Sequence, residues 1–127
     1  MARHFTVDEA NAILPRIRSL VASVLAARQR ILDVQPEVWP VLEKAVGNGG
    51  SKKAGALIED FKKIDDGVKT IQALGVVVKD INTGLIDFPA LRGDREVFLC
   101  WRYDESTVTY WHELHTGFAG RQMIDWR

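Results

Sequence analysis

The fold is decided where the spacing of apolar residues changes, in the stretch Gly75-Val76-Val77-Val78-Lys79-Asp80-Ile81-Asn82-Thr83-Gly84-Leu85-Ile86-Asp87-Phe88. Residues 76–81 are rich in β-branched side chains and predict a strand. Residues 82–84 predict a turn, and residues 85–88 a partner strand. Proline lacks an amide hydrogen, so we expect the pairing to end at Pro89. The stretch therefore predicts a β-hairpin that begins a sheet.

The residues that follow predict a second hairpin. A turn at 92–95 precedes two aromatic and β-branched runs, residues 96–103 and 108–112, which flank Asp104-Glu105-Ser106. Such runs are typical of strands. Together with the first hairpin they predict a four-stranded antiparallel meander, followed by an irregular, glycine-punctuated segment over residues 116–121.

The part before residue 75 has helical spacing instead. Thr6 and Glu9 form a capping-box pattern, so a helix is expected to begin near Val7. Pro15 lacks a helical donor, and we expect a kink or a restart near Leu14. The apolar residues step by four and three, as in a coiled coil, at Ile13, Ile17, Leu20, Val24, Ala27, Ile31 and Val34.

Two further helical pieces are expected. The pattern allows either a break near Gln35 with a short piece ending before Gly47, or one continuous kinked helix. Residues 47–51 predict a loop, with Ser51 capping the next helix and Gly75 at its C-terminal end. The apolar residues of that helix are Ala54, Leu57, Phe61, Ile64, Val68 and Ile71.

The predicted fold is thus α+β, in a single domain over residues 1–127. A long coiled-coil-like helical hairpin occupies residues 1–74, and an antiparallel sheet with a C-terminal tail occupies residues 75–127. The chain has 46% hydrophobic and 27% charged residues, which excludes a disordered tail. Its 17 basic and 17 acidic residues cancel, so no nucleic-acid partner is expected. One cysteine excludes an internal disulfide, and no signal-peptide or membrane-helix pattern is seen, so we expect a cytoplasmic protein without a membrane partner.

The candidate metal ligands are Asp87, Cys100, His112 and His115, because carboxylate, thiolate and imidazole bind zinc and similar metals. A two-residue turn between the last strands puts His112 on the opposite face from Cys100, whereas a three- or five-residue loop puts them on one face. The histidines come together only if the chain bends after Glu113. No paired zinc motif is present, so no cofactor is predicted outright, and a buried cysteine with a hydrogen-bonded histidine is the alternative to a divalent metal such as zinc.

The first hairpin leaves the environment of Asp87 open. A two-residue turn at 83–84 places Asp80 opposite Asp87, and a three-residue turn places Lys79 there instead. We favour the ion pair between Lys79 and Asp87.

Two further site hypotheses use arginines. In a thiol enzyme, Cys100 is the nucleophile, His112 the base, and Arg121 or Arg102 holds an anionic substrate. Cys100 lies in mid-strand, which favours an inert thiol. Alternatively, a small anionic ligand binds at the candidate residues Arg92, Trp101, Arg102 and Arg121, beside the glycine-punctuated segment.

Several motifs resemble a known family over nearly the whole chain. They are Phe5-Thr6-Val7-Asp8-Glu9-Ala10-Asn11, Leu74-Gly75-Val76, Lys79-Asp80, Gly84-Leu85-Ile86-Asp87-Phe88-Pro89-Ala90, Leu99-Cys100-Trp101-Arg102, Tyr110-Trp111-His112 and Gly117-Phe118-Ala119-Gly120-Arg121-Gln122. Together they resemble the bacterial family catalogued as domain of unknown function 2203. The resemblance implies no activity, substrate or cofactor, and His115 departs from the acidic or variable residue expected there.

From these observations we expect a small, cytoplasmic bacterial protein with a binding or structural-regulatory role rather than an enzyme. The apolar stripe of the helical part favours a homodimer formed through it. The alternative is a metal-binding or thiol-dependent enzyme with a site at Cys100, His112, Asp87 and Arg121.

Overall fold

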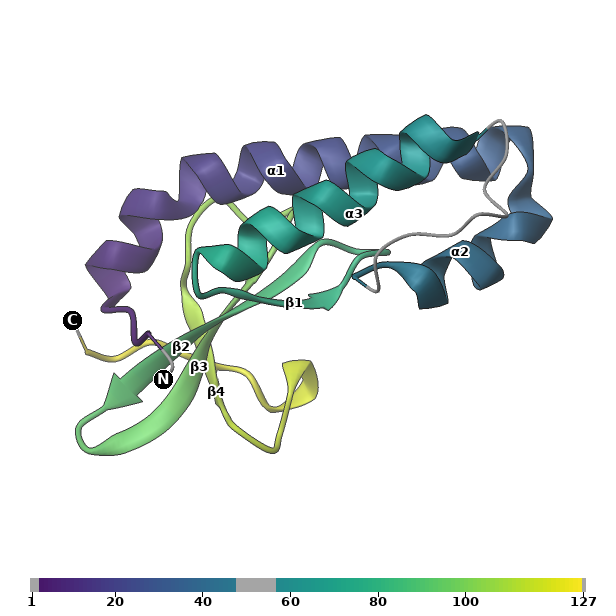
Figure 1. The fold of residues 1–127 in the computed structure, drawn as a ribbon. Helices are drawn as coiled ribbons and strands as arrows, with labels where there is room; N and C mark the ends of the chain where they lie inside the picture. Colours follow the sequence, from purple (N-terminus) through teal and green to yellow (C-terminus); the bar gives the residue numbers. More distant parts are fainter. Residues whose placement is uncertain (1–2, 48–56, 127) are drawn as a thin grey trace.

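The computed structural model describes residues 3–47 and 57–126, in which helices precede an antiparallel sheet (Figure 1). This confirms the α+β class. The helices are α1 (Val7–Val34), η1 (Pro36–Val38), α2 (Trp39–Ala45), α3 (Ile58–Ala73) and η3 (Phe118–Gly120), and the strands are β1 (Val77–Asp80), β2 (Leu85–Arg92), β3 (Arg95–Arg102), β4 (Tyr110–Glu113) and β5 (Gln122–Met123).

Helix α1 begins at the predicted capping box. The Glu9 amide donates to Thr6 Oγ1 at 3.0 Å, and the Thr6 amide donates to Glu9 Oε1 at 2.8 Å. Pro15 lies inside the helix, which continues to Val34. Figure 1 shows the first turns of α1 inclined to the rest, so the helix kinks and the predicted restart is wrong.

The remaining helices divide as the proline and glycine positions suggested. α1 ends at Val34, and the amide of the capping residue Gln35 still donates to the Ile31 carbonyl. η1 and α2 form the short second piece. A left-handed Gly75, with φ of 87°, follows α3. A helical hairpin is not confirmed, because η1 and α2 separate α1 from α3, which packs beside it (Figure 1). The expected loop and cap at Ser51 lie outside the described residues.

The sheet has five strands in the order β1-β2-β3-β4-β5, all antiparallel. The four-strand prediction is corrected by β5, in which Gln122 pairs with Trp111 and Met123 with Tyr110. Two residues are too few to show the alternation by which strands are recognised in sequence.

Pro89 does not end β2, contrary to the prediction, because the strand continues to Arg92 in register with β3. The pairing of β1 with β2 stops at Asp87, so the side of Pro89 away from β3 is an edge. The Pro89 carbonyl accepts from the Phe5 amide at 2.7 Å. Since the carbonyl and amide positions of a strand residue point the same way, the missing hydrogen of Pro89 also faces that edge and costs no ladder bond.

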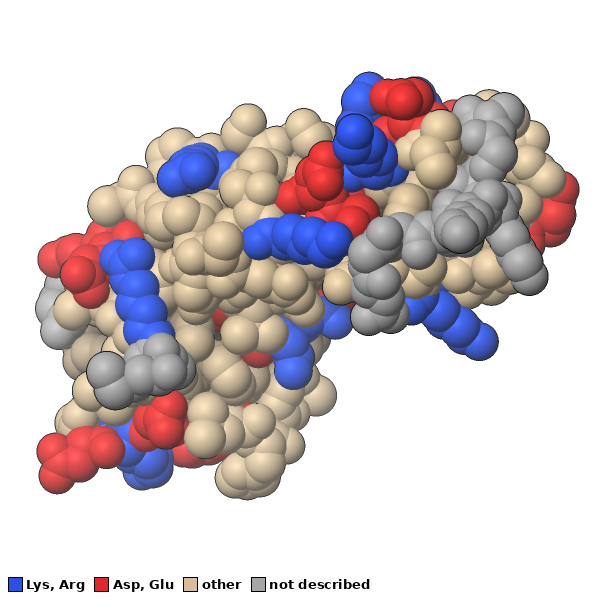
Figure 2. All heavy atoms as spheres, in the orientation of Figure 1, with Lys and Arg blue, Asp and Glu red and all other residues tan. Residues whose placement is uncertain are grey.

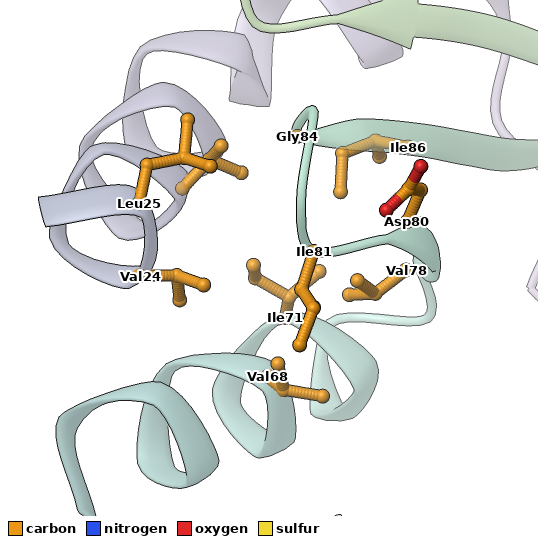
Figure 3. Close-up of a pocket in the computed structure, with 10 residues that line it drawn as sticks. Val24, Leu25, Val68, Ile71, Val78, Asp80, Ile81, Gly84 and Ile86 are labelled. Atoms are coloured by element: carbon orange, nitrogen blue, oxygen red, sulfur yellow. The ribbon is translucent and has the colours of Figure 1, made fainter. Parts of the chain in front are cut away.

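One face of the sheet, here called the inner face, packs against α1. Its buried residues are Ile86, Phe88, Ala90, Val97, Leu99, Trp101 and Trp111. A second cluster joins the later turns of α1 to α2 and α3. Where the helices meet the first hairpin, apolar side chains enclose a cavity of about 10 Å³ (Figure 3), far too small for a ligand. The turn approaches α1 so closely there that a Cβ on Gly84 would lie 2.8 Å from a Val21 methyl carbon.

By length and composition alone, α1 could cross a membrane, a test that core helices of soluble proteins also pass. Its buried residues pack in the two clusters described above, which is the arrangement of a core helix. On the face drawn in Figure 2, cationic and anionic side chains lie beside one another without a broad patch of either sign.

Candidate metal centre

The opposite face of the sheet, here called the outer face, brings three predicted ligands together. Asp87 is paired with Cys100 across β2 and β3, and Cys100 with Tyr110 across β3 and β4. His112 lies two residues beyond Tyr110 and is paired with Phe98. Because side chains alternate along a strand, Asp87, Cys100 and His112 all project from the outer face.

The length of the loop between β3 and β4 determines that Cys100 and His112 share a face. Residues 103–109 join β3 to β4, a longer connection than any of the turn lengths considered from the sequence. The resulting register is the one in which Cys100 and His112 share a face, so the two-residue turn is wrong.

A bulge in the first hairpin decides the partner of Asp87. The register shifts between Val78 and Asp80, and Val77 is placed opposite Asp87. The predicted ion pair of Lys79 with Asp87 is therefore wrong, as is a facing pair of Asp80 with Asp87. Asp87 is instead turned toward His112.

The imidazole of His112 is held at both nitrogens. Nδ1 donates to the backbone carbonyl of Glu113 at 2.7 Å, which requires a hydrogen on Nδ1 because a carbonyl only accepts. Nε2 lies 3.1 and 3.0 Å from the two carboxylate oxygens of Asp87. The side chains of His112 and Asp87 are each only 1% exposed. The Nε2 contact therefore contains one proton shared by a buried pair.

Cys100 completes the group, with a ligand atom from each of the three residues lying within 4.8 Å of the others. Its side chain is fully buried. Burial, followed by the negative charge of Asp87, raises the pKa of the Cys100 thiol from 9.0 to about 12, against a smaller opposing effect of Arg121. The thiol therefore keeps its proton near neutral pH, and its sulfur lies within 4.8 Å of an Asp87 carboxylate oxygen.

This geometry does not suit a thiol nucleophile. Activation of Cys100 needs a base that takes the thiol proton, and His112 Nε2 is engaged by Asp87 instead. The raised pKa of Cys100 also argues against a nucleophilic role, because the thiolate is the reactive form.

Arg121 closes the outer face beside Cys100. Its Nη2 donates to both carboxylate oxygens of Glu105 at 2.6 Å and to the Cys100 carbonyl at 3.4 Å. The guanidinium carbon lies 4.1 Å from the ring centre of Tyr110 and 4.5 Å from that of Phe118. Arg121 is thus sandwiched between an aromatic ring of the sheet and one of η3.

Of the four candidate anion-binding residues, Arg102 and Arg121 lie close together. Arg102 lies 5.0 Å from the ring centre of Phe118, which it shares with Arg121, and it pairs with Asp104. Trp101 is buried on the inner face, and its indole nitrogen donates to the Glu105 carbonyl.

The other predicted residues lie apart. Arg92 is at the far end of β2, beside Trp111, and pairs with Asp125. His115 is exposed in the turn that follows β4 and, within the described part of the chain, does not join the cluster of ligand atoms.

Sequence reasoning missed Glu105, the partner of Arg121. Glu105 lies in the connection between two strands, where no periodicity assigns a direction to its side chain. The only available signal was its charge, close in sequence to Cys100 and Arg102.

Comparison with known proteins identifies the family of this chain. A family model described as "Uncharacterized conserved protein (DUF2203)" matches residues 3–124, nearly the whole chain. No curated protein and no solved structure gives a match.

Proposed function

Since this chain belongs to the family of uncharacterized conserved proteins DUF2203, we propose its function from the site itself: it binds a divalent metal ion of the zinc class. The observation that carries the proposal is the convergence of Asp87, Cys100 and His112, three different metal-ligating groups, at one buried point. A carboxylate, a thiol and an imidazole together match the ligand preference of zinc.

The orientation of His112 supports the proposal. Histidines that bind metals almost always donate their other ring hydrogen to a carboxylate or a backbone carbonyl, which fixes the ring. Here Nδ1 donates to the Glu113 carbonyl, and Nε2 is left directed at Asp87.

Distances and charges also fit. Ligand atoms around a tetrahedral zinc are about 3.5 Å apart, so a group spread over 4.8 Å needs to contract by roughly 1 Å. A divalent ion would replace the thiol proton of Cys100 and the proton between His112 and Asp87. It would neutralise the carboxylate and the thiolate, a pairing that buried charges require.

The burial of the ligands favours binding over catalysis. Catalytic metals keep a position open to substrate, whereas the three ligand side chains are at most 1% exposed. We infer that the metal stabilises the outer face, in a non-enzymatic, structural or regulatory role.

The test is metal binding by tag-free protein. We expect one equivalent of zinc by mass spectrometry after loading and desalting, and a thiolate-to-metal absorption band with Co²⁺. Cys100→Ser should lose the band and most of the affinity, while the control His115→Ala should keep both. Folded wild-type protein that retains no metal, or equal binding by Cys100→Ser, contradicts the proposal.

A second candidate function, self-association, is supported by exposed apolar residues at one end of the helical part. Val34 is 71% exposed, Val41 56% and Ile58 44%. They lie where α1 ends, in α2, and where α3 begins, and these segments meet at one end of the molecule (Figure 1). We propose that a second copy covers this end, forming a homodimer.

A further inference from the structure

We propose that residues 114–121 form a strap over the outer face, latched by the pair of Arg121 with Glu105, whose local opening controls access to Cys100 and His112. The identity of the guest, a metal ion, rests on the proposed function. The opening itself concerns only the strap and the buried thiol, so it can be tested without metal.

Glu105 is the fixed half of the latch. One of its carboxylate oxygens accepts from the Arg102 amide at 2.8 Å. Its backbone carbonyl accepts from the Trp101 indole at 2.9 Å and from Arg18 at 3.0 Å. Glu105 is thereby tied to β3 and, through Arg18, to α1.

Arg121 is the movable half. Among the described residues, the ion pair with Glu105 is the only one that ties residues 114–121 to the rest of the chain. Both side chains are largely buried, at 11% exposure for Arg121 and 19% for Glu105. A pair so shielded from water loses more when one charge is removed than an exposed pair does.

The closed strap also contains an unfavourable feature. The Nε of Arg121 is buried and has no hydrogen-bond partner, and a buried unpaired donor costs free energy that opening to water returns. The side chain of Phe118, in the strap, is 39% exposed, so its burial contributes little to holding the strap closed. The pair of Arg121 with Glu105 therefore supplies much of the free energy that holds the strap closed.

Position in the fold makes a local opening feasible. The strap follows β4, runs through η3, and rejoins the sheet only at the two-residue strand β5. Short elements with few buried contacts open without global unfolding. Release of Arg121 would uncover Tyr110 and the backbone of Cys100, which it contacts.

The experiment measures thiol labelling of metal-free protein in the presence of a chelator. A chromogenic disulfide reagent reacts only with exposed Cys100, which is the single cysteine of the chain. We expect Glu105→Gln, which keeps an acceptor for the Arg102 amide, to be labelled about tenfold faster than wild type, with a weak dependence on denaturant. The control Asp125→Asn, which breaks the exposed pair with Arg92, should be labelled at the wild-type rate.

The outcomes separate the two proposals. If labelling of both wild type and Glu105→Gln rises with denaturant as steeply as global unfolding, or if the variant reacts no faster, the strap is overturned. If no zinc binds but Glu105→Gln is labelled faster as expected, the strap is supported and only the proposal of metal binding is contradicted.

Discussion

At the scale of single residues, the outer face brings a carboxylate, a thiol and an imidazole together at one buried point. Asp87 is approached by two groups, the thiol of Cys100 and the imidazole of His112. Both carboxylate oxygens of Asp87 and both ring nitrogens of His112 have a hydrogen-bond partner in the group or on the backbone, as buried polar atoms require. Under the proposed function, a metal ion would compete with protons for these three ligands.

The pKa of Cys100 leads to a prediction for metal-free protein. Its folded-state pKa of about 12 exceeds the ordinary 9.0, so the folded state holds the thiol proton after the unfolded chain has lost it. This contribution to stability is complete below pH 9 and is lost as pH rises from about 9 toward 12, at about 1.4 kcal/mol per pH unit. The free energy of unfolding of wild type, measured against pH with denaturant, should fall relative to that of Cys100→Ala. Parallel curves for the two proteins would refute the assignment.

How far the site could be predicted follows from the same residues. The ligand types were readable at Asp87, Cys100 and His112, and alternation along each strand was predictable. Whether His112 shares a face with Cys100 was not, because it depends on the parity of the loop between β3 and β4, and the β1 neighbour of Asp87 was not, because it depends on a bulge after Val78. Neither has a local sequence signal here, and both are stabilised by tertiary contacts.

At the scale of elements, α1 holds the loop that fixes that parity. The Asn11 side chain accepts from the Val108 amide at 2.9 Å and donates to the Val108 carbonyl at 3.4 Å. Arg18 donates to the carbonyls of Tyr103, Glu105 and Ser106. A helix residue thus replaces the neighbouring strand that Val108 lacks.

We therefore expect Asn11→Ala to lower the free energy of unfolding by about 1–3 kcal/mol, because Val108 loses its partners while remaining buried. Hydrogen exchange should accelerate most at the Val108 amide. Ser19→Ala, at an exposed position of the same helix, is the control and should change stability by less than about 0.5 kcal/mol. Equal effects of the two substitutions would mean that Asn11 does not hold the loop.

The elements that were predictable carry their own signals. The capping box of Thr6 and Glu9, the glycine after α3 and the turn at Gly93 are local patterns, and each is found where expected. Continuation of β2 through Pro89 and the pairing of β5 depend instead on neighbours distant in sequence, Phe5 and Trp111. Local propensity contains no information about such neighbours.

At the scale of the whole molecule, α1 belongs to both hydrophobic clusters. Its first half packs on the inner face of the sheet, and its second half packs with α2 and α3 and, from the first hairpin, with Val78 and Ile81. The sheet end is thereby covered on its inner face by α1 and beside its outer-face site by Arg121. At the helical end, Val34, Val41 and Ile58 are exposed.

The dimer proposed for that end gives the prediction at this scale. A lysine at Val41 would place an unpaired charge in the interface, and burying such a charge is far more costly than burying valine. Sedimentation equilibrium should give a dimer for wild type and a monomer for Val41→Lys, with unchanged circular dichroism. Leu91→Lys, at an exposed apolar position on the sheet, is the matched control and should remain dimeric. A wild-type monomer at about 100 μM, where even a weak dimer with a Kd near 10 μM would form, would leave the helical end without a second copy.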